Sequence, residues 1–230
     1  MKITWLGHSA FRIETGNSVL LTDPFMGAYG GDPVAATAGA THIALTHGHD
    51  DHVGDTVEIC KRNGATLIAV FELAAFLQAK GVEKAEYANT GGTIVTPDFD
   101  VTFVRADHTS STFGPDGNPI YLGNPCGLVI TTREGKTIYH MGDTDIHAGM
   151  GLVNELHRPT IGIVPIGDRF TMGPRTAAFA CNKFFDFELI IPCHYKTFPP
   201  LLQSADPFIE AMGDKAGKVR AIQSGESITI

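Results

Sequence analysis

Short apolar runs, broken by glycine, proline and polar turns, recur along most of the chain. Runs of this kind, rich in β-branched residues, predict β-strands. The first 25 residues predict two strands around the turn at 15–18. Further strands are predicted at residues 42–46, 66–70, 94–96, 101–104, 128–132, 137–140, 161–166, 190–193, 219–223 and 227–230. Residues 27–39, rich in glycine and alanine, predict a loop.

Longer stretches between the strands predict helices. Residues 54–63 and 72–80 are each followed by a glycine, which readily takes the left-handed conformation that ends a helix. Pro174 suits the first turn of a helix over 175–184, and Ser204 is a candidate cap for a helix reaching Met212. Strands interleaved with helices predict two packed sheets with helices outside them. No linker divides residues 1–230, so a single domain is expected.

Composition narrows the class of protein. The 230 residues are 43% hydrophobic, which suits one α/β domain with a sizeable core. The formal net charge of −8, with no block of Lys or Arg, disfavours a nucleic-acid partner, because phosphate contacts need a basic surface. No apolar stretch approaches the roughly 20 residues of a membrane span, so no membrane partner is expected. The start lacks a signal-peptide pattern and the four cysteines are scattered, so a reducing, cytoplasmic location is expected.

The largest cluster of candidate functional side chains lies at residues 47–52, where three imidazoles and two carboxylates follow the predicted strand at 42–46. Imidazole nitrogens and carboxylate oxygens are ligands that Zn²⁺ accepts readily. A solvated polar turn is the alternative, but such a cluster has little reason to exist in a structural loop. Three further candidates follow other predicted strands in the same way: His108, Asp143 and His194.

The spacing His-x-His-x-Asp-His at residues 47–52, followed in order by a lone His, an Asp and a final His at strand ends, resembles the metallo-β-lactamase superfamily of metal-dependent hydrolases. Within it, the chain is most similar to the UPF0173 metal-dependent hydrolases. They belong to the branch of L-ascorbate-6-phosphate lactonase-like proteins, and the similarity runs through residues 5–14, 22–25, 165–167, 170–174 and 194–199. The resemblance implies an α/β (α+β) fold, a four-layer αββα sandwich of the metallo-β-lactamase type.

The resemblance also implies two divalent metal ions. It assigns the first ion to His47, His49 and His108, the second to Asp51, His52 and His194, and a bridging position to Asp143. Zn²⁺ is the expected metal, with Mn²⁺ and Fe²⁺ as alternatives. The imidazole at position 49 disfavours a redox function, because di-iron redox members of the superfamily usually carry Glu there.

The reaction implied is attack by a metal-bound hydroxide on an electrophilic carbonyl carbon or phosphorus. Asp51 is the expected catalytic residue, which orients the nucleophile or passes a proton. Two residues outside the ligand set, His8 and Asp23, are expected to support the site by holding its ligands. Three more are candidates for contact with the substrate, each with a solvated loop residue as the alternative: Ser110, Arg169 and Lys196.

The function predicted is therefore cleavage of an ester, lactone or related bond in a small anionic metabolite. Two alternatives stay open: a phosphodiesterase or nuclease of the same fold, and a non-catalytic metal-binding regulatory protein. The acidic charge argues against the nuclease, and the complete ligand set argues against the regulatory protein. Association into a homo-oligomer also stays open, because the sequence does not decide it.

Overall fold

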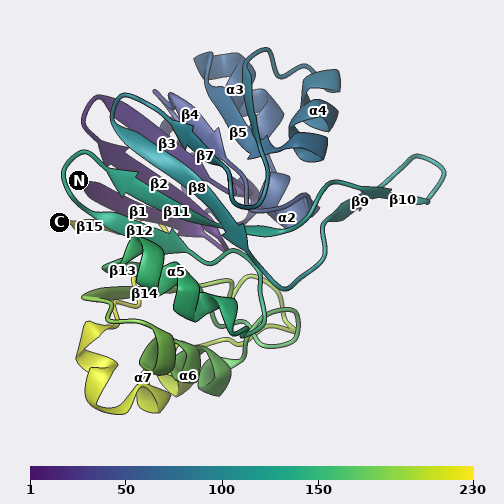
Figure 1. Ribbon diagram of the computed structural model, residues 1–230. Coiled ribbons are helices and arrows are strands. Elements are labelled where there is room, and N and C mark those ends of the chain that lie inside the picture. Colours follow the sequence, from purple (N-terminus) through teal and green to yellow (C-terminus); the bar gives the residue numbers. More distant parts are fainter.

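The computed structural model describes residues 1–230 and places two β-sheets against each other, with helices outside them (Figure 1). The first sheet has seven strands in the order β15-β1-β2-β3-β4-β5-β6, and the second has six in the order β14-β13-β12-β11-β8-β7. A single hydrophobic core of 57 buried residues draws on both sheets. The predicted fold class, a sandwich of mixed α and β structure, is confirmed.

The first sheet consists of β1 (Lys2–Gly7), β2 (Ala10–Thr15), β3 (Ser18–Thr22), β4 (His42–Ala44), β5 (Thr66–Val70), β6 (Ala85–Ala88) and β15 (Ser227–Thr229). The second consists of β7 (Thr93–Val95), β8 (Phe99–Arg105), β11 (Cys126–Thr132), β12 (Thr137–His140), β13 (Ile161–Pro165) and β14 (Leu189–Cys193). A separate hairpin consists of β9 (Ser111–Phe113) and β10 (Pro119–Tyr121). The helices are η1 (Met26–Ala28), α1 (Pro33–Ala36), α2 (Asp50–Val53), α3 (Thr56–Asn63), α4 (Phe71–Ala79), α5 (Gly149–His157), α6 (Pro174–Phe184), α7 (Asp206–Ala211) and η2 (Gly213–Lys218).

Parallel strands bring the segments with candidate ligands to one edge of each sheet. Strands β3, β4, β5 and β6 run parallel to one another, and so do β12, β13 and β14. Ligands in such sheets gather outside the carboxyl ends of the strands. The motif at 47–52 follows β4, while Asp143 follows β12 and His194 follows β14. The prediction that these candidates lie at the C-terminal ends of strands is confirmed.

Two predictions near the N-terminus were wrong. The first 25 residues form three strands instead of two, because Gly7 (φ 100°) and His8 (φ 51°) turn the chain after β1. The predicted loop at 27–39 contains part of η1 and the short helix α1. Asp32 caps α1 by accepting a hydrogen bond from the amide of Val34, and Pro33 begins the first turn.

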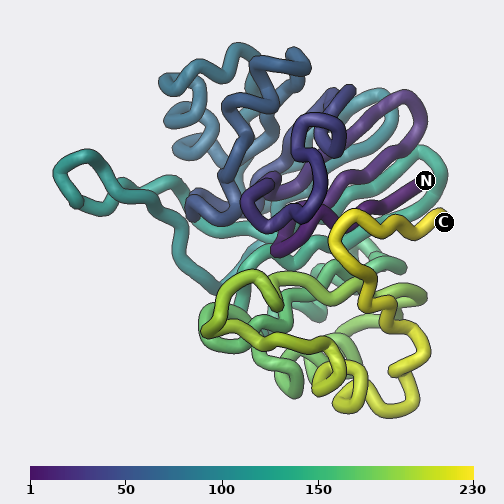
Figure 2. Tube along the Cα trace, turned by 180° about the vertical axis from the view of Figure 1, so that it is seen from behind, coloured from purple at the N-terminus to yellow at the C-terminus, as the bar shows by residue number.

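Other boundaries also differ from the predictions. Residues 219–223 do not form a strand, since only Val219 pairs, through an isolated bridge to Ile190. The helix predicted from residue 54 begins at Thr56, because Gly54 (φ 43°) separates it from α2. The last α-helix begins at Asp206, two residues beyond Ser204. Helix α5 and the hairpin β9–β10 were not predicted, and the hairpin projects from the body of the molecule (Figures 1 and 2).

The two chain ends lie side by side, as the view from behind shows (Figure 2). Strand β1 pairs with β15, and the N-terminal amine donates to the side chain of Glu134 at 2.8 Å and to the carbonyl oxygen of Ile230 at 3.2 Å. None of the helices combines the length and apolarity needed to cross a membrane.

Candidate metal centre

The motif at 47–52 leaves β4 as a tight loop and then enters α2. Gly48 is required in this loop, because a Cβ atom there would lie 2.6 Å from the side chain of Leu122. The amide of Gly48 donates to Ser110 Oγ at 3.0 Å, and Ser110 Oγ donates to the carbonyl oxygen of Leu122 at 3.2 Å. Ser110 is buried and both contacts are with the backbone. Its hydroxyl therefore holds the motif loop in place, and its predicted contact with a substrate stays a prediction.

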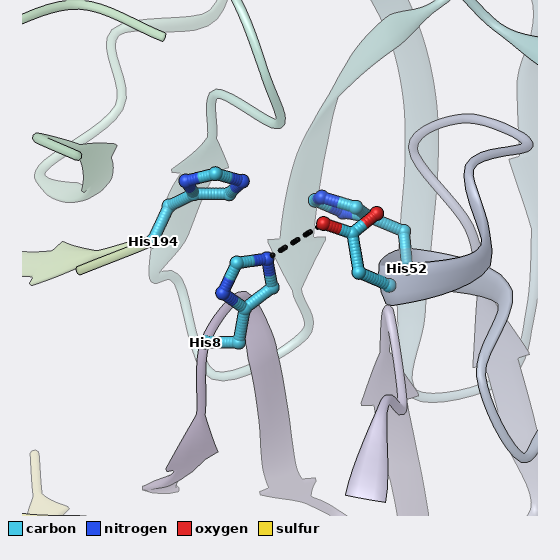
Figure 3. Close-up of side chains that lie close together, drawn as sticks. His8, His52 and His194 are labelled. Carbon is cyan, nitrogen blue, oxygen red and sulfur yellow. Dashed lines mark hydrogen bonds and ion pairs between the residues drawn. The ribbon is translucent and has the colours of Figure 1, made fainter. Parts of the chain in front are cut away.

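The fold gathers all seven predicted ligands into three groups whose donor atoms lie within 4.8 Å of one another. The groups are His47, His49 and His108; then Asp51, His52 and His194 together with His8; and finally His47, His52 and Asp143. The first two groups match the two predicted ion sites, and the third connects them. Figure 3 shows His8, His52 and His194 close together although they come from three distant elements.

Asp143 occupies the middle of these groups. Its Oδ2 atom lies 3.0 Å from Nε2 of His194, 3.4 Å from Nε2 of His52 and 3.6 Å from Nε2 of His108. Burial alone would raise the pKa of Asp143, but His52 and His194 outweigh burial and hold that pKa well below its ordinary value. An ionised carboxylate that faces donors of both ion sites suits a bridging ligand.

The buried polar atoms of the cluster fit a bound cation. Nε2 of His52, both ring nitrogens of His194 and Oδ1 of Asp143 are buried without a hydrogen-bond partner. Buried polar groups normally have partners, so unpaired atoms at one place call for an ion or water. Burial, with the neighbouring imidazoles, holds the pKa of His47 well below its ordinary value. That shift keeps the ring neutral, which is the form that binds metal.

The electrostatics of His52 also fit a bound cation. Burial disfavours its charged form, but the carboxylates of Asp143 and Asp23 outweigh burial and raise the pKa of His52 well above its ordinary value. The centre thus favours positive charge among its nitrogen and oxygen donors. A divalent cation that accepts such donors, Zn²⁺ among them, would supply that charge in place of a proton.

Asp23 lies behind the centre, where it holds His52. Its Oδ2 atom lies 2.8 Å from Nδ1 of His52 and accepts a hydrogen bond from the hydroxyl of Thr46 at 2.7 Å. Its Oδ1 atom accepts from the amide of Thr46 at 2.8 Å. Asp23 is fully buried, and these contacts turn the other ring nitrogen of His52 toward Asp143. A carboxylate placed in this way can orient a ligand histidine, and the supporting role of Asp23 stays a prediction.

Asp51 and His8 face each other at the second group. Nε2 of His8 lies 3.2 Å from Oδ2 of Asp51, and Nδ1 of His8 lies 2.9 Å from the hydroxyl oxygen of Thr197. Burial would raise the pKa of Asp51, but the close contact with His8 and the charge of His52 lower it far below the ordinary range. Asp51 is therefore ionised at neutral pH.

Arg169 and Lys196 lie on loops near the centre and are exposed. The ammonium of Lys196 lies 5.6 Å from the centre of the Tyr195 ring, and neither cation forms an ion pair in the structure. The amide of Leu202 donates to the carbonyl oxygen of Gly167 at 3.0 Å, which links the loops that carry the two cations. Both are free to meet an anion from solvent.

Some groups at the centre were missed from the sequence. The hydroxyls of Thr46 and Thr197 contact ring nitrogens of His47 and His8. Thr197 and His8 are far apart in the chain, so no local pattern predicts their contact, whereas Thr46 is the sequence neighbour of His47. A second feature is the left-handed backbone of five non-glycine residues around the centre, at His8, Asp23, Asp168, His194 and Lys196. Strain of this kind gathers at functional sites, where the surrounding structure holds it.

Two cavities flank this region. A pocket of about 380 Å³ adjoins His108 and is also lined by Arg105, Asp107 and Asn124. A larger groove of about 750 Å³ lies between β8 and α5, and contains none of the predicted ligands. The smaller pocket therefore offers space for a substrate beside the candidate ligands.

Comparison with known proteins agrees with the fold and with a metal-dependent hydrolase. Residues 2–194 match the model of the β-lactamase superfamily domain. A UPF0173 metal-dependent hydrolase of Brucella anthropi is 56% identical over 218 residues, covering 93% of each chain. A second, from Brucella canis, is 55% identical over 230 residues, covering 98% of this chain and 97% of the relative.

Solved structures show the same likeness. Igni18, a metallo hydrolase of Ignicoccus hospitalis, superposes with a TM-score of 0.86 at 31% identity, covering 99% of this chain and 97% of its own. An isothiocyanate hydrolase from Delia radicum gut bacteria shares the fold, with a TM-score of 0.78 at 18% identity, over 100% of this chain and 99% of its own. The chain therefore belongs to the β-lactamase superfamily and, within it, to the UPF0173 metal-dependent hydrolases.

Proposed function

We propose that this metal-dependent hydrolase uses two divalent ions, Zn²⁺ in the first place, to cleave an ester or lactone in a small anionic metabolite. The observation that carries the proposal is the pair of donor groups, each large enough for one ion, that meet at Asp143. A lone ion would leave one of these groups without a cation. The first group would leave coordination positions open, as catalytic zinc sites do.

When bound, two such ions act as Lewis acids and lower the pKa of water toward neutrality. The chain's own residues then orient the reactants. Asp51 is ionised and partly exposed, so its carboxylate can accept a hydrogen bond from an attacking water molecule and hold that molecule in line. His8 holds Asp51 from the other side through the 3.2 Å contact.

Three cations near the centre support an anionic substrate. Arg105 lines the pocket beside His108, while Arg169 and Lys196 are exposed on the loops that follow β13 and β14. The chain has a net charge of −8, so cations without an ion-pair partner beside the candidate active site would favour an anionic substrate there. They would attract a carboxylate or phosphate group on the substrate.

Apolar contact is available on the His8 side. The Phe25 ring lies 6.0 Å and the Phe198 ring 5.5 Å from the ring of His8, both edge-on, and the two phenyl rings lie 6.2 Å apart. Phe198 is 37% exposed, so part of its ring is open to a bound molecule. A substrate with both an anionic group and a short apolar part matches these surroundings.

The test combines metal content with a substrate panel. We would measure metal by elemental analysis in the wild type, in His49→Ala, and in His157→Ala as a control on a histidine outside the centre. About two zinc ions per chain, with fewer in His49→Ala only, would support the two-ion proposal. Hydrolysis of anionic lactones or esters above that of a chromogenic phosphodiester would support the substrate class, and the reverse order would favour the phosphodiesterase. No metal after reconstitution would overturn the proposal.

A further inference from the structure

Three histidines of the centre share one arrangement of ring contacts. In each ring, Nδ1 faces an oxygen atom at hydrogen-bond distance: Thr46 Oγ1 at 2.9 Å for His47, Asp23 Oδ2 at 2.8 Å for His52, and Thr197 Oγ1 at 2.9 Å for His8. In each ring, Nε2 faces other members of the donor groups: His49 at 2.9 Å for His47, Asp143 at 3.4 Å for His52, and Asp51 at 3.2 Å for His8.

This arrangement is typical of a histidine that binds a metal ion. Such a residue donates the hydrogen of one ring nitrogen to an oxygen acceptor, which fixes the tautomer and aims the lone pair of the other nitrogen at the ion. His47 and His52 belong to the predicted ligand set. His8 does not, although the surroundings of its ring are built in the same way.

The position of His8 fits a ligand of the second ion. Its donor atom lies within 4.8 Å of those of Asp51, His52 and His194, and its ring centre lies 4.0 Å from that of His194. Figure 3 shows the ring turned toward the same space as the rings of His52 and His194. With the hydrogen on Nδ1, the lone pair of Nε2 faces a carboxylate oxygen of Asp51 at 3.2 Å. A cation between these two atoms would satisfy both.

The backbone holds the His8 ring in this place. His8 has a φ of 51°, which residues with a side chain rarely adopt. Its carbonyl oxygen accepts hydrogen bonds from Nε1 of Trp5 at 3.0 Å and from the amide of His194 at 2.9 Å. Only 1% of the residue is exposed. The turn is thus fixed to the strand end that carries His194, which matches the precision that a metal site requires.

We propose that Nε2 of His8 is a fourth protein ligand of the second divalent ion, beside Asp51, His52 and His194. The proposal rests on the two-ion function above. Its consequence is an unequal pair of sites. Apart from the shared Asp143, four side chains hold the second ion and three hold the first. The second ion is therefore the one retained longer on dialysis, and the first keeps more open positions for water and substrate.

The test isolates the second site in the full-length chain with Co²⁺ as the probe. His49→Ala/His108→Ala removes two donors of the first site. In this background we would compare the chain that keeps His8 and Thr197 with three variants, His8→Ala, His8→Gln and Thr197→Val. His157→Ala is the control. Metal-free samples are titrated with Co²⁺ by absorption and calorimetry, and X-ray absorption counts the imidazoles around the ion. Circular dichroism of the metal-free variants checks the fold.

Removal of an outer partner of a ligand typically weakens metal binding about 10–100-fold. We therefore expect Thr197→Val to weaken Co²⁺ binding within that range while the imidazole count stays the same. His8→Ala should weaken binding more than about 100-fold and remove one imidazole. If His8→Ala and His8→Gln keep the imidazole count, His8 only orients Asp51 and the inference is overturned. If the unmodified chain does not bind two ions, the two-ion function itself fails.

Discussion

The amide of His194 donates a hydrogen bond of 2.9 Å to the carbonyl oxygen of His8, which joins the turn after β1 to the end of β14. These segments belong to different sheets and lie near opposite ends of the chain. Both residues have a left-handed backbone, with φ of 51° for His8 and 57° for His194. The bond therefore fixes one half of the candidate metal centre against the other, and changes near it should disturb metal binding before they disturb the core.

Gly167 tests this coupling most directly. A Cβ atom at this position would lie 2.1 Å from the carbonyl oxygen of His194, so Gly167→Ala must displace the backbone that carries this ligand. We expect the variant to lose the second ion while the first stays bound. Elemental analysis after dialysis measures this, with Gly217→Ala as the control, because no atom lies within 4 Å of a Cβ there. Two ions per chain in Gly167→Ala would contradict the expectation.

His140 is predicted to stabilise the backbone next to the candidate metal centre. Its buried ring donates through Nε2 to the carbonyl oxygen of Ser9 at 3.1 Å, and its Nδ1 accepts from the amide of Gly142 at 3.1 Å. His140→Leu would leave both backbone groups unpaired, which costs about 1–3 kcal/mol. Urea unfolding of the metal-free protein should show this loss, whereas His157→Leu should unfold like the wild type. An equal midpoint for His140→Leu would refute the role.

Trp5 should report occupancy of the second group through its fluorescence. It is the only tryptophan, it donates to the carbonyl oxygen of His8 at 3.0 Å, and it stacks on Tyr195 at 5.4 Å between ring centres. Binding of an ion beside His8 and His194 should therefore change its emission. Titration of metal-free protein with Zn²⁺ measures this. The same titration of His52→Ala should show a much smaller change, and identical curves would mean that Trp5 senses a different event.

Glu134 is predicted to make part of the stability depend on acid. The hydrogen bond from the N-terminal amine, and then those from Gly16 and Thr15, lower the pKa of Glu134 from 4.5 to about 2. Because the folded pKa is the lower one, the contribution is complete above pH 4.5 and is lost as the pH falls toward about 2. The difference in urea midpoint between the wild type and Glu134→Gln should therefore shrink across this window. A constant difference would exclude the ion pair as its cause.

The motif at 47–52, the three later candidates and the strands before them could be predicted from the sequence alone. These features are local, since the spacing of the ligands is set by covalent geometry and the strands by short apolar runs. The family resemblance, which rests on the same residues, gave the fold class. Residues 219–223 show the limit of this reasoning. An apolar run becomes a strand only where a neighbouring strand is free to pair with it, and here only Val219 pairs, through an isolated bridge to Ile190.

How the two halves of the centre meet became visible only in the folded chain. Asp23 on His52, Thr197 on His8 and His8 beside His194 are contacts between residues far apart in the chain. Their distances depend on the order of strands in each sheet and on turns with left-handed backbones, which no local pattern encodes. The same holds for Ser110, which looked available to a substrate in the sequence and is buried against the motif loop in the fold.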